Sequence, residues 1–454
     1  MELKLEEIFA NFPEVSKPLK RLSLKDKLIW TGIALLLYFV LSLTPLYGLA
    51  PDYVAQFETL AILLAANFGS LISLGIGPIV TGSIMLQLLV GADVIKIDLK
   101  SSDGKRKYQA YQKMFSVFFI VFENAAYVLS GALPAATPTV FNLSILIIQL
   151  IIAGLMLLFL DEVTSKWGIG SGISLFIAAG VARELFVKAF SPVMDPRMHV
   201  PTGAVPRIIT LIAQGSSSLA FWPFIAIVST IIVFLIAVYF SGVQINIPLS
   251  FGRVRGFGMK WPIKWFYTSV MPVILVSALI VSLQMWGLMM FNAGYPILGE
   301  FEGQEAVSGI VRYLHPPTFV EIFQTGMTSI ALRSIFVYSF IMIGGAVFFS
   351  YLWLNVSKTG PSDVADQILE SGLSIPGFRR DKRILEKVLK RYIVPLAILG
   401  GFTIGALAVL ADLFGALSRG TGIMLTVIII YQFYENIKKA HMEEMSPAMR
   451  KVMG

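Results

Sequence analysis

Apolar residues gather in ten long runs along the chain, separated by shorter polar stretches. A helix that crosses the hydrocarbon core of a bilayer needs about 20 mostly apolar residues, and each run has roughly that length. The pattern therefore predicts an all-α polytopic membrane protein, with ten transmembrane helices at 28–48, 75–95, 114–133, 141–160, 168–190, 219–240, 268–291, 334–354, 393–411 and 414–434.

Composition and charge agree with this prediction and add an orientation. Of 454 residues, 56% are hydrophobic and 14% are charged, whereas soluble proteins carry roughly 25% charged residues. Most of the 36 Lys and Arg residues lie in the N-terminal segment 1–27, in the tail 435–454 and in the segments that follow even-numbered runs. By the positive-inside rule, this bias places both termini in the cytoplasm and the protein in the cell membrane. The net charge of +8 then needs no nucleic-acid partner.

A polar stretch at 191–218 divides the ten runs into two halves, 28–190 and 219–434. Each half holds five runs, and because five is odd, a second half built like the first must enter the membrane upside down. Inverted repeats of this kind place a transport pathway at the interface between the halves. An accidental division into five and five stays open as the alternative.

One apolar stretch, 58–95, is too long for a single straight crossing. Gly69 and the segment Gly75–Pro78 interrupt it, and both residue types weaken or end helices. This pattern predicts a short half-helix at about 58–72, a turn, and then a full span. Pro272 sits at the matching place in the other half, where it marks either an interruption or an ordinary proline kink.

The residues that usually carry catalysis are scarce. The chain has no Cys, only 3 His, no Gly-rich nucleotide loop and no H-E-x-x-H motif. We therefore expect no enzymatic activity, no cofactor and no metal site. Glu123 is the one ionisable residue in the middle of a run. Ion-coupled transport needs buried ionisable groups along the ion pathway, and a single carboxylate is weak support for it. A channel, a secondary transporter of a small solute and a structural scaffold remain as alternatives.

Two polar segments within the second half are strongly basic. Segment 241–265 contains Arg253 and Arg255 among aromatic residues, and segment 355–392 contains Arg379 in a dense run of Lys and Arg. Basic clusters bind phosphate backbones or anionic lipid headgroups. The alternative is that these basic clusters only fix the orientation of the helices in the membrane.

Five stretches together resemble the SecY family, the channel subunits of the protein translocon, and more its archaeal and eukaryotic branch than its bacterial one. They occur in the family's order and span essentially the whole chain. The stretches are 75–89 (GIGPIVTGSIMLQLL), 161–180 (DEVTSKWGIGSGISLFIAAG), 247–256 (IPLSFGRVRG), 363–379 (DVADQILESGLSIPGFR) and 420–434.

The resemblance implies two inverted five-helix halves around a central pore with an apolar constriction. The residues that match this pore ring are Ile76, Val80, Ile173, Ile177, Ile274 and Leu425. Two pairs among them are four residues apart and so share one helical face. An aliphatic ring grips many sequences weakly and resists ions by dewetting.

The resemblance also implies a plug and a lateral gate. The half-helix at about 58–72 matches the plug, with Leu60, Leu63, Leu64 and Phe68 as its apolar residues. Thr81 and Glu123 match two polar residues of the gate, and Ser282 stands where the family usually has Asn. With Ser282 in that place, the resemblance still implies the gate but not the strength of the polar contact across it.

The function implied is passage of unfolded polypeptides across the membrane and lateral release of their transmembrane segments into the bilayer. Arg253, Arg255 and Arg379 match residues that dock the ribosome, which would drive translocation. The other partners implied are small membrane subunits of the SecE or gamma type and of the SecG or beta type, signal sequences, nascent chains and membrane lipids.

Overall fold

The computed structural model divides the chain into two compact units. Unit 1 comprises Met1–Pro206 and Ile429–Gly454, and unit 2 comprises Arg207–Ile428. The residues that the structure describes are 14–20, 22–50, 69–91, 94–97, 101–129, 131, 133–195, 199–251, 258–268, 271–292, 294–302, 305–315, 318–357, 359–374 and 381–444.

Each of the ten predicted runs coincides with a helix in the described part of the chain. These helices are α2 (Leu24–Leu43), α4 (Gly77–Gly91), α5 (Ser102–Leu129), α6 (Val140–Trp167), α7 (Gly172–Phe190), α9 (Ser217–Gly242), α10 (Met271–Asn292), α13 (Ser329–Val356), α15 (Lys382–Leu413) and α16 (Gly420–Glu444). Among the described residues, α2, α6, α9, α13 and α15 are long and apolar enough to span a membrane by length and composition.

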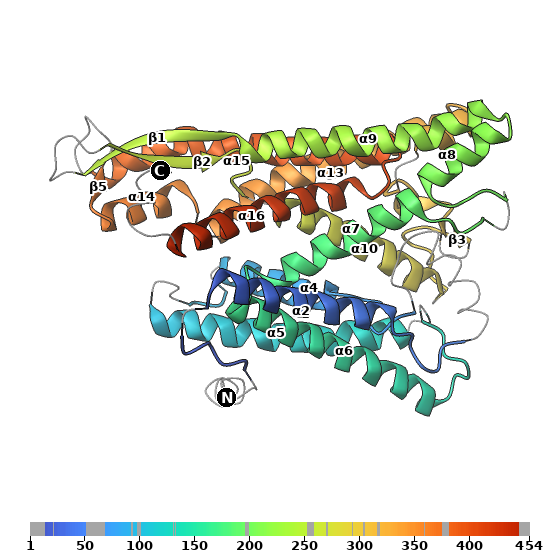
Figure 1. Cartoon of the computed structure of the whole chain (residues 1–454), viewed down its shortest axis with the longest axis horizontal. Coiled ribbons are helices and arrows are strands. Elements are labelled where there is room, and N and C mark those ends of the chain that lie inside the picture. Colours follow the sequence, from blue (N-terminus) through green and yellow to red (C-terminus); the bar gives the residue numbers. More distant parts are fainter. Residues whose placement is uncertain are drawn as a thin grey trace. The chain divides into compact units, whose positions relative to one another are not determined.

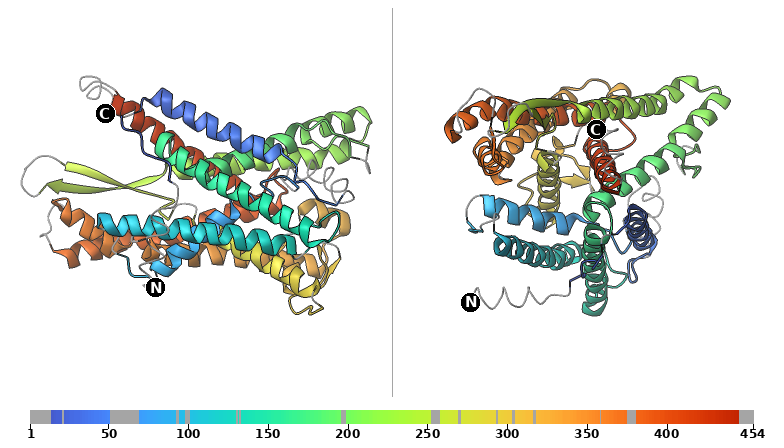
Figure 2. Two further views of the ribbon diagram at one scale, coloured as in Figure 1. Left: turned by 90° about the horizontal axis from the view of Figure 1, so that it is seen from below. Right: turned by 60° about the vertical axis from the view of Figure 1, so that its left-hand side comes forward.

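In unit 1, α2 and α4–α7 share one apolar core (Figure 1). Its fully buried side chains include Ala34 of α2, Ile79 of α4, Ile120 of α5, Leu157 of α6 and Phe176 of α7. The backbones of α4 and α5 approach closely because Gly82 has no side chain: a Cβ there would lie 2.8 Å from the Phe115 carbonyl carbon. Figure 2 shows these two helices next to each other.

The predicted break before the second span is present as a tight turn at residues 69–76. Gly69 and Gly75 have φ of +78° and +57°, in the left-handed region that favours glycine. The turn is tied to the end of α2, because the Leu46 N–H donates to the Gly69 carbonyl at 2.8 Å. The half-helix predicted at about 58–72 lies mostly outside the described residues.

In unit 2, α13 and α15 pack closely through small residues. A Cβ on Gly401 would lie 2.8 Å from the Ala346 carbonyl oxygen, so only glycine permits this approach. Pro272 is the second residue of α10. The first turn of a helix leaves its N–H groups without intrahelical partners, so proline there removes no helical hydrogen bond.

A small sheet connects the two basic segments of unit 2. Strand β1 (Gln244–Phe251) pairs antiparallel with β2 (Gly258–Lys264) and with β5 (Leu373–Ser374), in the order β2-β1-β5. The sheet lies beside α14 (Pro361–Glu370) and the beginning of α15 (Figures 1 and 2). Ile247, Ile263, Ile368 and Leu389 are buried together there.

The remaining elements of the described chain are short. Helix α8 lies within the predicted polar stretch 191–218. These elements are α8 (Ala204–Ala213), β3 (Phe301–Glu302), β4 (Glu305–Ala306), α11 (Gly309–Arg312) and α12 (Phe319–Thr325).

Candidate functional site

The four predicted ring residues of unit 1 lie at the beginnings of two helices. Ile76 directly precedes α4, and its carbonyl accepts the Val80 N–H at 3.0 Å. Ile173 and Ile177 occupy successive turns at the start of α7. All four side chains are half-buried. Ile76 and Ile173 both pack against the core that α2 and α4–α7 share.

The two predicted ring residues of unit 2 also lie near the beginnings of helices. Ile274 lies in the first turn of α10, and Leu425 lies in the second turn of α16. Both are half-buried and pack against the core that includes Val273, Met342 and Met424. The six predicted positions therefore share an aliphatic side chain and a degree of burial, and four of them, Ile76, Ile173, Ile274 and Leu425, pack on the core of their own unit.

Two of the three predicted gate residues meet in unit 1. Thr81 of α4 and Glu123 of α5 are half-buried, and the Glu123 carboxyl interacts with the Thr81 hydroxyl. The Thr81 hydroxyl also donates to the Gly77 carbonyl at 3.1 Å. Ser282 lies in the middle of α10. One polar contact thus sits between two closely packed helices.

Other predicted site residues lie outside the described part of the chain. These are the plug residues Leu60, Leu63, Leu64 and Phe68 and the ribosome-docking residues Arg253, Arg255 and Arg379.

The basic segments themselves are organised by the sheet, which the sequence analysis did not anticipate. Strand β5 of segment 355–392 pairs with β1 of segment 241–265, where Leu373 lies opposite Phe251. Alternation of apolar residues at 245, 247, 249 and 251 was the available sequence signal. The phenol of Tyr267 donates to the Thr359 carbonyl at 2.8 Å, and burial, with Asp363 nearby, raises the pKa of Tyr267 to about 12.

The first turns of α15 form an exposed basic face. Leu385 and Leu389 are buried against the sheet and α14, whereas the basic side chains around them point outward. The exposed basic residues are Lys382, Arg383, Lys387, Lys390 and Arg391. Lys382 pairs with Asp366 of α14 at 2.8 Å. Solvated cations on one helix face suit binding of an extended anionic surface.

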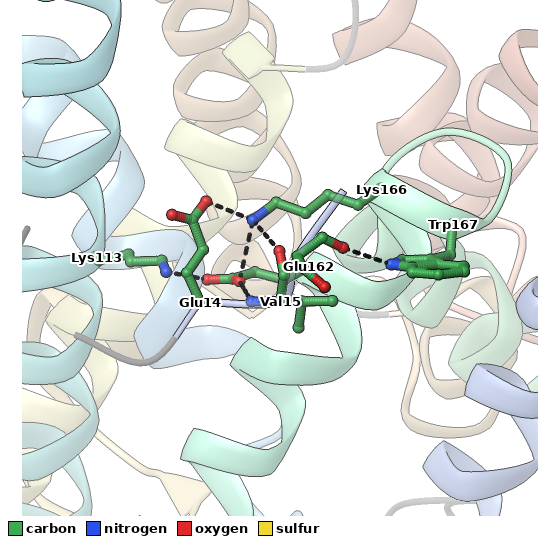
Figure 3. A network of polar contacts seen from close by, with 7 residues as sticks. Glu14, Val15, Lys113, Glu162, Lys166 and Trp167 are labelled. Carbon is green, nitrogen blue, oxygen red and sulfur yellow. Dashed lines mark hydrogen bonds and ion pairs between the residues drawn. The ribbon is translucent and has the colours of Figure 1, made fainter. Parts of the chain in front are cut away.

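A polar network holds the N-terminal segment against α6 and α5 (Figure 3). The Glu162 carboxylate accepts the Val15 N–H at 3.0 Å and forms ion pairs with Lys113 and Lys166. Lys166 also pairs with Glu14 and donates to the Val15 carbonyl at 2.8 Å. We call Glu14, Lys113, Glu162 and Lys166 the ionic cluster.

Burial makes the ionic cluster unusual. The side chains of Lys113, Glu162 and Lys166 are only 16%, 11% and 15% exposed. The hydrogen bond from Lys166, aided by the charges of Lys166, Lys113 and Lys17, holds the pKa of Glu14 below its ordinary value of 4.5. No sequence motif marks this cluster, because its members are spread over residues 14–166. Among the described residues, no group of three or more His, Asp or Glu is placed to hold a metal ion.

Comparison with protein families gives two adjoining matches. A family model described as SecY matches residues 70–434, and one described as the plug domain of Sec61p matches residues 36–69. The protein translocase subunit SecY of Methanothermobacter thermautotrophicus is 42% identical over 99% of this chain and 98% of its own. That of Pyrococcus furiosus is 42% identical over 98% and 97%.

Solved structures show the same fold. A SecY structure in which the plug domain stabilises the closed channel matches with a TM-score of 0.81 and 37% identity, over 97% of this chain and 98% of that one. Sec61 in a canine ribosome–channel complex from the endoplasmic reticulum matches with a TM-score of 0.78 and 37% identity, over the same shares.

These matches remove the solute-transporter and scaffold alternatives, because they cover the chain almost end to end. They also supply the arrangement of ten transmembrane helices in two inverted halves. The chain therefore belongs to the SecY family: it is a protein-conducting channel subunit of the Sec translocon, a transport protein and not an enzyme.

Proposed function

We propose that the six half-buried aliphatic residues form the constriction through which unfolded polypeptides pass. These are the ring residues Ile76, Val80, Ile173, Ile177, Ile274 and Leu425. What supports this proposal is that all six side chains are half-buried, and that Ile76, Ile173, Ile274 and Leu425 pack on the core of their own unit. Contact between aliphatic groups is non-directional, so such a ring accepts many sequences. A narrow apolar ring also opposes ions by dewetting.

The plug and the lateral gate are the moving parts in this proposal. Leu60, Leu63, Leu64 and Phe68 would seat the plug on the ring, and the family match to a plug domain over 36–69 supports that role. Thr81, Glu123 and Ser282 would line the gate through which apolar segments reach the lipid. The contact between Thr81 and Glu123 supports the assignment for those two residues.

A docked ribosome would supply the driving force on the cytoplasmic side, where we also place both termini. The support is the exposed basic face of α15, the sheet that joins both basic segments, and the ribosome–channel complex of a 37% identical relative. Arg253, Arg255 and Arg379 would contact phosphates of ribosomal RNA. Small membrane subunits of the SecE and SecG types would complete the channel.

Crosslinking of a stalled nascent chain tests the constriction directly. Since the chain has no native Cys, a photoreactive probe can be attached to Ile173→Cys or Ile274→Cys alone. We expect both positions to capture the nascent chain. Ile152→Cys is the matched control, because Ile152 is 53% exposed on α6, outside the proposed ring. Equal capture at 152, or none at 173 and 274, would refute the constriction.

A further inference from the structure

A carboxylate of α6 binds the end of the turn between α6 and α7. Asp161, near the end of α6, accepts the Ile173 N–H at 2.9 Å and the Ser171 hydroxyl at 3.4 Å through Oδ1. The turn packs directly on α6, because a Cβ on Gly172 would lie 2.6 Å from the Asp161 Cα. Asp161 thus binds the first turn of α7 to the helix before it.

The turn between α15 and α16 is built in the same way in unit 2. Asp412, the second-last residue of α15, accepts the Gly420 N–H at 2.7 Å through Oδ1. Its Oδ2 accepts the Tyr338 hydroxyl at 2.6 Å. Gly420 also packs on α15, because a Cβ there would collide with the Ala408 carbonyl oxygen.

The two turns share their chemistry although their sequences differ. In each half, an Asp at the end of the fourth helix accepts a backbone N–H at the start of the fifth. The first N–H groups of a helix have no intrahelical acceptor and carry the positive end of the helix dipole. A carboxylate there satisfies one of them with a charge-assisted hydrogen bond, which is stronger than a neutral one.

Both bonds lie next to proposed ring residues. Ile173 is itself the residue whose N–H binds Asp161, and Ile177 follows one turn later. Leu425 lies five residues after Gly420, on α16. A helix turns by about 100° per residue, so a rotation at its first turn by even one residue would point these side chains elsewhere.

We propose that Asp161 and Asp412 are positioning residues of the channel: each fixes the rotation and height of the last helix of its half, and thereby the direction of the ring side chains. This inference rests on the proposed function, since it assigns the purpose of the bonds to the ring.

Amide hydrogen exchange of the complete translocon in lipid, at residues 171–175, tests the Asp161 bond without reference to conduction. Asp161→Ala removes the acceptor, and we expect exchange there to rise at least about tenfold, as loss of a hydrogen bond to a charged group implies. Asp161→Asn keeps a carbonyl acceptor at the same place and should retain most of the protection. Glu184→Gln, a carboxylate-to-amide change near the other end of α7, is the matched control and should leave exchange at 171–175 unchanged.

Ion conductance of the resting channel in planar bilayers tests the purpose of the bond. We expect Asp161→Ala and Asp412→Ala to raise the leak severalfold, Asp161→Asn to raise it little, and Ile173→Gly to raise it most. Tyr338→Phe leaves the Asp412 carboxylate on Gly420 and should have an effect smaller than Asp412→Ala.

The outcomes separate the two proposals. If Ile173→Gly leaks while both Asp→Ala variants stay tight with unchanged exchange, the ring stands and the positioning role is refuted. If Ile173→Gly itself stays tight, the ring fails, and with it the role assigned to the two Asp residues. If Asp161→Ala does not fold, Asp161→Asn provides the test. Folded Asp161→Asn protein with exchange and leak as high as we expect for Asp161→Ala would refute a role for the acceptor that Asn retains.

Discussion

The ring residues of unit 1 and the ionic cluster lie on neighbouring helices but are held by different physics. Ile76 and Ile173 contact the core through dispersion and apolar burial, which depend little on direction. Glu162 is held by one backbone N–H and two ammonium groups in a largely water-free place. In the proposed ring, the first arrangement would deform around a passing chain, whereas we expect the second to lose stability when one partner is removed.

The comparison teaches which substitutions each region tolerates. Aliphatic positions tolerate a change of shape if volume is kept. Buried charges do not tolerate loss of a partner, because an unpaired buried charge costs far more than the intact pair contributes.

The strongest test of the ring is to delete its side chains and then to replace them. Ile76→Gly with Ile274→Gly should raise the resting ion conductance in planar bilayers by an order of magnitude or more, because water then fills the constriction. Ile76→Leu with Ile274→Leu is the matched control and should stay nearly tight. A tight Gly variant would contradict the ring, and a leaking Leu variant would contradict its tolerance.

The ionic cluster should tolerate substitution far less than the ring residues do. Glu162→Ala leaves Lys113 partly buried without its carboxylate and Lys166 with Glu14 alone, and we expect a loss of about 3–5 kcal/mol of stability, measured by denaturant unfolding in detergent. Lys113→Met together with Glu162→Leu removes opposite charges and should recover part of that loss. A double variant no better than Glu162→Ala would show that the cost is not electrostatic.

Exposed charges should behave differently from buried ones. Lys387→Glu with Lys390→Glu on the outer face of α15 should weaken ribosome binding, most at low salt, because each phosphate contact releases counterions. Stability should hardly change, since both side chains are exposed. Arg379→Glu should add to the effect. Affinity that is independent of salt would remove α15 from the docking surface.

The smallest effect concerns Glu14, at the open edge of the ionic cluster. Its pKa is lowered in the folded protein, mainly by the hydrogen bond from Lys166. A lowered pKa means that the contribution of Glu14 is present above its ordinary pKa of 4.5 and is lost as pH falls through the folded value.

Protonation of Glu14 should loosen the N-terminal segment from α6. A spin label at Leu19→Cys measures this loosening, because Leu19 is fully exposed in the same segment. The label should become more mobile as the pH is lowered below 4.5. Glu14→Gln should make the label mobile at neutral pH and abolish its response to acid in this range. A label whose mobility is unchanged by Glu14→Gln would show that Val15 and Trp167 suffice to hold the segment, through hydrogen bonds at 3.0 Å and 2.8 Å.

Prediction of helix ends was less accurate than prediction of the helices. The ninth run was placed at 393–411, but α15 begins at Lys382. Its first turns are amphipathic: Leu385 and Leu389 pack on α14 and the sheet, while basic residues face outward. A search for uniformly apolar sequence does not find such a turn, since only its partner elements make it a stable helix.

The ten helices, the break before the second span and the family could be predicted from the sequence alone, because apolar runs, glycine–proline interruptions and family motifs are each read from a continuous stretch of sequence. Three other features became visible only in the folded chain: the pairing of β1 with β5, the ionic cluster that joins residues 14, 113, 162 and 166, and the Asp161 and Asp412 bonds. Each depends on directional contacts between residues of different helices, strands or segments. No periodicity in the chain encodes which donor will face which acceptor.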